Sequence, residues 1–352
     1  MSRTPSAHWV PDTLRRRVPY TDKPFVEQHD PYEISLGLGH REISHLLEII
    51  YDQQATRMDK IKALRLLNDV LPGREAEAIQ LHAFDALRPL LLQQNNGLLL
   101  HTLVALNTLI STIQDAEKLS SDIPRIVEVI DPENEVPLRI AAATLLSHIA
   151  ELLGPIDPFI EGDVPIKIVA AAASKYSTPP LLAELFRLLS RLTNKQKVRV
   201  PLIENKDLLK VIVKSIANPD LQMLVINLAE NVAMDSGNNG KLALLDVDIL
   251  DELGPLLSSP KVTVRMATIS LITLLSVPKE GKERIAMERS IADTLKNISE
   301  SDPDLECRRA ALKCRIIVAE LPFGKVIVGD IVDPSEPVRK PEGEINEEAP
   351  QE

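Results

Sequence analysis

Two glycines, two histidines and an Arg-Glu pair occur together in GLGHREISHLLEII, residues 37–50, and these are residue types found in phosphate loops and metal sites. A nucleotide-binding loop needs a third glycine, a preceding strand pattern and a lysine, and none of these accompanies Gly37 and Gly39. His40 and His45 are five positions apart, whereas paired zinc ligands on a helix are four apart. The stretch is therefore predicted to be a turn that leads into a helix.

The other groups that could do chemistry are scattered along the chain. Asp302 and Asp304 resemble a catalytic carboxylate pair, but they lie where a helix N-cap belongs, and capping explains them. Three further histidines fall in different segments with no pattern of carboxylate partners: His82, His101 and His148. We predict no catalytic residue, no metal site, no cofactor and no small-molecule substrate, so the chain is expected not to be an enzyme.

The two cysteines, Cys307 and Cys314, are seven positions apart. On one helix this places them two turns apart, too far for a disulfide between them. They are predicted to be buried thiols in a reducing compartment.

The composition favours helices and protein partners. Of the 352 residues 44% are hydrophobic but only 3% are aromatic, so the core must be mostly Leu, Ile, Val and Ala. The net charge of −11 argues against nucleic-acid binding. The sequence contains no run of 18 or more apolar residues, so no transmembrane helix is predicted. The first residues lack the apolar stretch of a secretory signal, and no membrane partner is expected.

Helical segments recur with a period near 40 residues. First helices are predicted near residues 42, 86, 123, 164, 208, 249 and 291, and after each comes a polar hinge and a more apolar second helix. Arg139, Arg265 and Arg308 recur at the start of the second helix. This period with paired helices is typical of armadillo or HEAT repeats. The prediction is an all-α solenoid of about seven degenerate armadillo-like repeats over residues 40–332.

Two segments flank the predicted solenoid. Residues 333–352 are acidic and proline-rich, and are predicted to be a disordered tail. Residues 1–39 hold five prolines and four of the ten aromatic residues, which predicts an extended arm that docks on another surface or caps the first repeat. The residues predicted to make the contacts of this arm are Trp9, Arg15, Arg16, Arg17, Tyr20, Phe25, Tyr32, His40 and Arg41.

Armadillo proteins that hold extended peptides carry an asparagine on the second helix of each repeat, because an amide can both donate to and accept from a peptide backbone. The equivalent positions in this chain, predicted to line a concave groove, are Asn68, Asn107, Ser147, Ser190, Glu230, Thr273 and Arg315. Four residues earlier, where the nuclear-import adaptors carry tryptophan, the chain has Leu64, Leu103, Ala143, Phe186, Ile226, Ile269 and Ala311. A nuclear-import adaptor that binds extended peptides is therefore disfavoured. The groove is predicted to bind a single partner of defined shape or to have only a structural role.

The stretches GLGHREISHLLEII, KALRLLNDVL and EAEAI resemble the opening repeat of the radial spoke head protein fourteen family. The similarity consists of Gly-His-Arg at residues 39–41, then Lys-Ala-Leu at 62–64 with Leu67 and Asp69, and it is sharpest over residues 37–80. Members of this family are armadillo-repeat subunits of the radial spokes in motile cilia and flagella.

This resemblance implies a non-enzymatic scaffold near the neck and head of the spoke, in the cytoplasm, cytoskeleton and axoneme, with other radial spoke proteins as partners. Two alternatives remain open. The chain could be a cytosolic adaptor that binds a peptide in its groove, or a regulatory subunit that carries an enzyme as its cargo.

Overall fold

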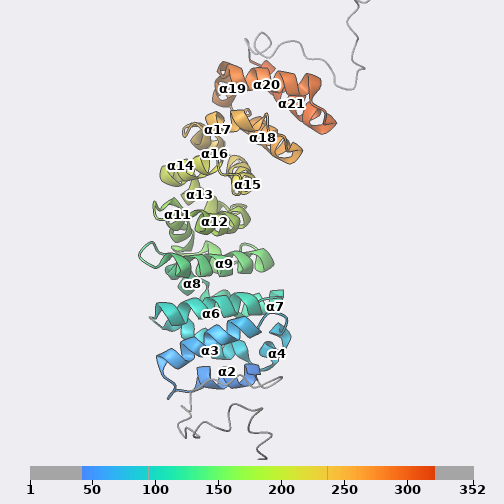
Figure 1. The fold of residues 1–352 in the computed structure, drawn as a ribbon. Coiled ribbons are helices and arrows are strands. Elements are labelled where there is room, and N and C mark those ends of the chain that lie inside the picture. Colours follow the sequence, from blue (N-terminus) through green and yellow to red (C-terminus); the bar gives the residue numbers. More distant parts are fainter. Residues whose placement is uncertain (1–41, 94, 236, 322–352) are drawn as a thin grey trace, which may run out of the picture.

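The computed structural model describes residues 42–93, 95–235 and 237–321, and within these ranges the chain is helical and contains no strand. The helices stack in sequence order into an elongated rod, with α2 (Glu42–Tyr51) at one end and α21 (Leu305–Ala319) at the other (Figure 1). The chain is therefore an all-α armadillo-like solenoid, as the 40-residue period predicted.

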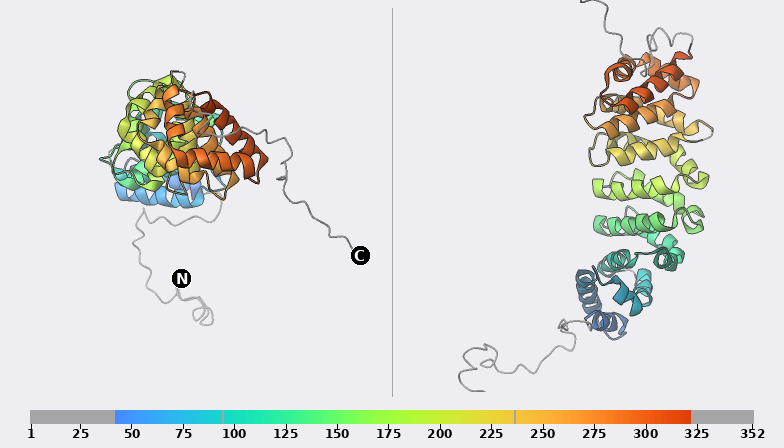
Figure 2. Two further views of the ribbon diagram at one scale, coloured as in Figure 1. Left: turned by 90° about the horizontal axis from the view of Figure 1, so that it is seen from above. Right: turned by 90° about the vertical axis from the view of Figure 1, so that its right-hand side faces the viewer.

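The longest helix of each repeat belongs to one column, which we call the inner column. Each of these helices packs against the next one along the rod, and the right-hand view of Figure 2 shows the stack from the side. They correspond to the seven predicted second helices and are α3 (Arg57–Val70), α6 (Asn96–Leu109), α9 (Val136–Leu153), α12 (Pro179–Leu192), α15 (Gln222–Ala233), α18 (Val262–Leu275) and α21.

A second column lies beside the inner column and is called the outer column here. It begins with α2 and contains the predicted first helices, of which the second is split into an α-helix and a 3-10 helix. Its other members are α5 (Ala83–Leu87) with η1 (Arg88–Leu92), α8 (Ile123–Val129), α11 (Val164–Ala173), α14 (Lys206–Ser215), α17 (Ile249–Leu256) and α20 (Arg289–Ser301).

Short helices connect each inner helix to the next outer helix, so a complete repeat has three helices where the sequence predicted two. They are too short to show a helical period, and Pro201 lies inside one of them. These connecting helices are α4 (Glu75–Gln80), α7 (Ile113–Lys118) with η2 (Ser120–Asp122), α10 (Asp157–Ile160), α13 (Gln196–Glu204), α16 (Asn239–Leu245) and α19 (Lys279–Met287).

Glycine allows two of the connecting helices to approach the preceding inner helix closely. A Cβ at Gly240 would lie 2.0 Å from the carbonyl oxygen of Val232, and one at Gly281 would lie 1.8 Å from that of Leu275. Any larger residue would push the connecting helix away from the end of the inner helix. These two glycines therefore fix the spacing of consecutive repeats in the second half of the rod.

The helix starts follow simple local chemistry. Pro124 and Pro165 lie in the first turns of α8 and α11, where the missing N–H costs no hydrogen bond. Asp304 caps α21, because its Oδ1 accepts a hydrogen bond from the Cys307 amide at 2.8 Å. The capping prediction for Asp304 is confirmed.

Both cysteines are buried and free, as predicted. Burial raises the pKa of Cys307 and of Cys314 to about 11, so neither thiol carries much thiolate at neutral pH.

Among the described helices, α9 is long and apolar enough to cross a membrane by length and composition. Half of that stretch is buried, and α9 packs between α6 and α12 in the middle of the inner column. Packing on both sides accounts for its apolar composition.

Candidate partner-binding surface

Polar side chains join consecutive helices of the inner column. Asn68 Nδ2 on α3 donates to the carbonyl oxygen of His101 on α6 at 3.0 Å. Asn107 Oδ1 on α6 lies 3.2 Å from Nδ1 of His148 on α9, which is the geometry of a hydrogen bond from a protonated Nδ1. The side-chain amides of both asparagines in the predicted ladder therefore form hydrogen bonds that join one repeat to the next.

The same kind of contact continues along the rod with different residues. Arg191 on α12 donates to the carbonyl oxygen of Ser147 on α9 at 2.9 Å, and its NH2 group pairs with Glu151 at 2.9 Å. Asn231 on α15 donates to the carbonyl oxygen of Ser190 on α12 at 3.0 Å. The backbone carbonyl groups of Ser147 and Ser190 thus accept these hydrogen bonds. The donors, Arg191 and Asn231, each lie one position after a residue of the predicted ladder.

Several residues of the predicted ladder are turned into the stack. Ser147 and Arg315 are each 2% exposed, so neither side chain reaches the surface of the groove. Arg315 bonds instead to Ser299 at 2.6 Å, and burial lowers its pKa. Thr273 Oγ1 donates to the carbonyl oxygen of Ile269 within its own helix at 2.7 Å. Contact of the half-buried ladder residues with a partner stays a prediction.

Glu230 is the ladder residue with unusual electrostatics. It is half-buried on α15 and hydrogen-bonded to Ser270 on α18. Burial raises the pKa of Glu230, and the bond from Ser270 opposes this rise in part. Burial of this carboxylate in the inner column therefore has some cost in solvation.

The solvent-facing side of the inner helices lies one residue away from the predicted ladder. Residues four before the ladder are completely buried in every repeat, from Leu64 to Ala311. Residues three before it are exposed or half-buried, and we call them the open inner face: Arg65, Val104, Thr144, Arg187, Asn227, Ser270 and Leu312. One helical turn further along, at a spacing of four, the same face continues through Asp69, Thr108, His148, Arg191, Asn231, Leu274 and Ile316.

The open inner face was missed because the ladder was aligned on Asn68 and Asn107. The alternation of completely buried and exposed neighbours, such as Leu103 and Val104, depends on packing against two adjacent helices. In helices that are apolar nearly all round, the sequence marks this difference weakly. The signals available were Arg65 with Asp69 and Arg187 with Arg191, charged residues at a spacing of four that a buried face excludes.

The open inner face differs in character from one repeat to the next. Between α6 and α9 it forms an apolar hollow of about 400 Å³ whose lining includes Val104 and Thr144. On α12 it carries Arg187, which pairs with Glu184, and on α21 it is apolar again, with Ile316 46% exposed. A ligand that repeats one chemical unit would not match such a surface.

Buried arginines fasten the inner helices from within. Arg139 is completely buried and donates to the carbonyl oxygens of Ile130 at 3.1 Å and Tyr176 at 3.3 Å, which belong to successive repeats. Arg265 forms a two-pronged bond to Asp302 of the next repeat at 2.8 and 2.9 Å, and this bond raises the pKa of Arg265. Of the three recurring arginines, Arg139 and Arg265 therefore hold neighbouring repeats together.

Groups that could do chemistry remain apart. Within residues 42–93, 95–235 and 237–321, no three His, Cys, Asp or Glu side chains lie close enough to hold a metal ion. Asp302 is bound to Arg265 and Asp304 caps α21, so the two carboxylates have separate structural roles. His101 is half-buried, and burial lowers its pKa.

The arm contacts lie outside the described residues. The nine predicted positions from Trp9 to Arg41 fall in residues 1–41. The predicted tail, residues 333–352, also lies outside the described residues.

Known structures share this fold. An engineered protein superposes with a TM-score of 0.66 at 16% sequence identity, covering 81% of this chain and 70% of that protein. A designed armadillo repeat protein in complex with the peptide (KR)4 gives a TM-score of 0.55 at 17% identity, covering 66% of this chain and 99% of that protein. No family model and no curated protein matches the chain. The likeness shows the armadillo fold.

Proposed function

We propose that the chain is a non-enzymatic armadillo scaffold that binds a protein partner along its open inner face, as a structural subunit of the radial spoke in motile cilia or flagella. The observation that carries the binding proposal is the continuous inner column, whose exposed residues change in character from repeat to repeat. A long surface of this kind spreads many modest contacts over one extended partner.

The polarity and charge of the open inner face change from repeat to repeat, which favours a single partner of defined shape over a peptide of repeated sequence. The designed relative was solved with (KR)4, a ligand that repeats a two-residue unit. In this chain, Val104 borders an apolar hollow, Arg187 is charged and Asn227 is neutral. A partner must therefore match an apolar hollow, the Arg187–Glu184 ion pair and a neutral amide in a fixed order, which is the way subunits of a large assembly recognise one another.

The radial spoke assignment is supported by the resemblance of residues 37–80 to the opening repeat of that family. The described part of this segment forms α2, α3 and α4 at one end of the rod. The acidic net charge of −11 would discourage non-specific adhesion to the acidic microtubule surface and favour specific contacts with other spoke proteins.

Localisation in ciliated cells tests the assignment. The chain would carry a fluorescent tag at its C-terminus, and axonemes would be extracted with detergent and then with salt. We expect signal along motile cilia that resists detergent and fractionates with spoke subunits. A diffuse cytosolic signal would overturn the spoke assignment and favour the adaptor alternative, while recovery with a kinase or phosphatase and without spoke proteins would favour the cargo alternative.

A further inference from the structure

A second hollowed surface lies on the outer column and its connecting helices. It consists of three adjoining hollows of about 750, 490 and 300 Å³. The first two share Glu161 and Gly162, and the second and third share Glu128 and Lys167, so they form one continuous surface. We call it the outer trough; it runs over α8, α10, α11 and α13 and includes no residue of an inner helix.

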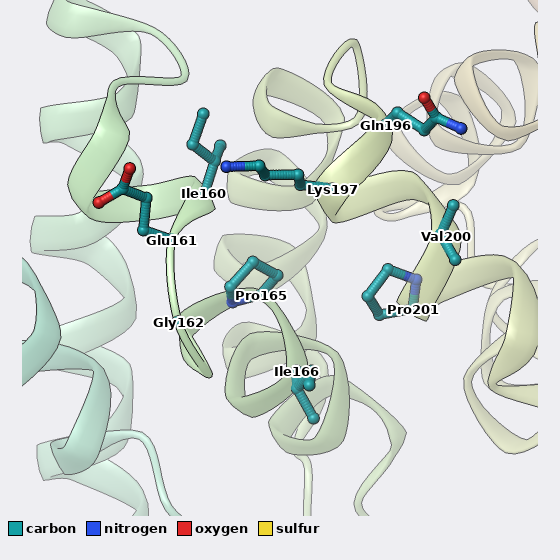
Figure 3. Close-up of a pocket in the computed structure, with 9 residues that line it drawn as sticks. All are labelled: Ile160, Glu161, Gly162, Pro165, Ile166, Gln196, Lys197, Val200 and Pro201. Carbon is teal, nitrogen blue, oxygen red and sulfur yellow. The ribbon is translucent and has the colours of Figure 1, made fainter.

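The floor of the outer trough is apolar and rigid. Figure 3 shows the hollow of about 750 Å³, which is lined by Pro165 and Ile166 on α11 and by Val200 and Pro201 on α13. Ile166 is 56% exposed and Val200 is 38% exposed, although both are aliphatic. Proline rings have no rotamer freedom to lose on binding, so this floor is prepared for a flat apolar group such as an aromatic ring.

The rim of the outer trough is acidic. Two lysines, Lys167 and Lys197, belong to it, which leaves a local net charge of 2 − 6 = −4. Of the described side chains, only Arg125 forms an ion pair with a rim carboxylate, at Glu128. The six rim carboxylates are Glu128, Asp131, Glu133, Asp157, Glu161 and Asp163.

We propose that residues 1–20 of this chain bind in the outer trough of the same chain. These residues lie outside the described part, but their sequence holds four arginines against one acidic residue, together with Trp9 and Tyr20. The Arg15-Arg16-Arg17 run supplies guanidinium groups to the unpaired carboxylates of the rim. The aromatic rings cover the exposed floor at Ile166 and Val200.

The connecting chain is long enough. About 25 residues separate Arg17 from the start of α2 at Glu42, and in extended form they span up to roughly 80 Å. From α2 to α11 the outer column advances by three helices, each step being about 10 Å. Residues 1–20 can therefore reach the trough within a single molecule.

Energy transfer from Trp9 tests the proposal, because Trp9 is the single tryptophan in the sequence. In the full chain, Lys197→Cys at the trough carries a naphthalene acceptor dye, and Lys313→Cys, exposed on α21, carries the same dye as a control. The native thiols do not compete for the dye, since both are buried with a pKa of about 11. We expect transfer to the dye at position 197 to be at least threefold more efficient than to the dye at 313.

Charge reversal gives the decisive comparison. Replacing all three arginines (Arg15→Glu, Arg16→Glu, Arg17→Glu) is expected to lower transfer at position 197 at least twofold. The trough variant Glu161→Lys with Asp163→Lys should do the same, and combining both sets should restore at least half of the lost transfer. Circular dichroism shows whether each variant keeps its helices.

Three results would overturn the proposal. One is equal transfer to the two dyes in the unaltered chain. Another is unchanged transfer at position 197 in the triple arginine variant. The third is transfer that disappears on dilution, because residues 1–20 would then bind a second copy and not their own chain.

Discussion

The inner column and the outer trough belong to the same repeats, yet they use polar side chains in opposite ways. On the inner column, Asn68, Arg191 and Asn231 each donate to the neighbouring inner helix. In the outer trough, five of the six rim carboxylates have no ion pair with a described residue. A polar residue that recurs along a solenoid can therefore join one repeat to the next, whereas a polar residue without an internal partner is the better candidate for binding.

The largest expected effect on the inner side comes from Asp302→Ala. It leaves Arg265 buried without its carboxylate, and removing one partner of a buried pair costs about 3–5 kcal/mol. Urea unfolding followed by circular dichroism measures the loss. Asp293→Ala, exposed on the neighbouring helix α20, is the matched control and should change stability by less than about 0.5 kcal/mol.

The double variant Arg265→Met with Asp302→Leu sharpens this result. Replacing a buried ion pair by apolar residues of similar volume is often nearly neutral, so the double variant should lose less stability than Asp302→Ala alone. A loss equal to or larger than that of the single variant would show that the pair does more than neutralise buried charge.

Substitution of the two asparagines that join inner helices is expected to have a smaller effect on stability. Asn68→Ala together with Asn107→Ala removes two contacts between inner helices and should lower the free energy of unfolding by about 1–3 kcal/mol. Asn227→Ala, exposed on the open inner face, is the control and should leave stability unchanged. Unaltered stability with complete loss of partner binding would instead support the peptide-adaptor alternative.

Glu230→Gln is expected to have a smaller effect that depends on pH. Because burial raises the pKa of Glu230, ionisation costs stability, and this cost is absent below the ordinary pKa of the carboxyl group and complete above the raised one. The variant should therefore be more stable than the unaltered chain at pH 7, and the gain should vanish below about pH 4.5. Thermal melts of both proteins from pH 4 to 8 would measure it, with Glu204→Gln as an exposed control.

The smallest stability effect is expected in the outer trough. Glu161→Lys with Asp163→Lys should change the free energy of unfolding by less than about 0.5 kcal/mol, because both side chains are exposed and neither forms an ion pair with a described residue. A loss of unfolding free energy near that of the Asn68→Ala and Asn107→Ala variant would mean that the trough residues stabilise the fold. The contrast with the inner column would then fail.

The sequence predicted the architecture well because burial in a solenoid repeats with the chain. The seven apolar second helices correspond to the seven inner helices, and Cys307 and Cys314 are buried. The connecting helices were not predicted, since α10 has only four residues and α13 contains a proline. Such short segments become helical through packing against their neighbours, and a short sequence window carries little trace of this.

The candidate surface was predicted less well, for a geometric reason. A shift of one residue turns a helix by about 100° and exchanges a buried position for an exposed one. Leu103 and Val104 illustrate this, because the first is completely buried and the second is 38% exposed. The periodic spacing of Asn68 and Asn107 was found correctly, but only the stacked helices show that their amides face the next repeat.

Retention of inner-face variants on the axoneme would show whether the open inner face holds a spoke partner. Arg187→Glu with Asn227→Glu alters that face, and Lys214→Glu with Asn297→Glu makes the same changes at exposed positions of the outer column. We expect salt to release the inner-face variant while the unaltered chain and the outer-column variant stay bound. Equal retention of both variants, with folding confirmed by circular dichroism, would contradict it.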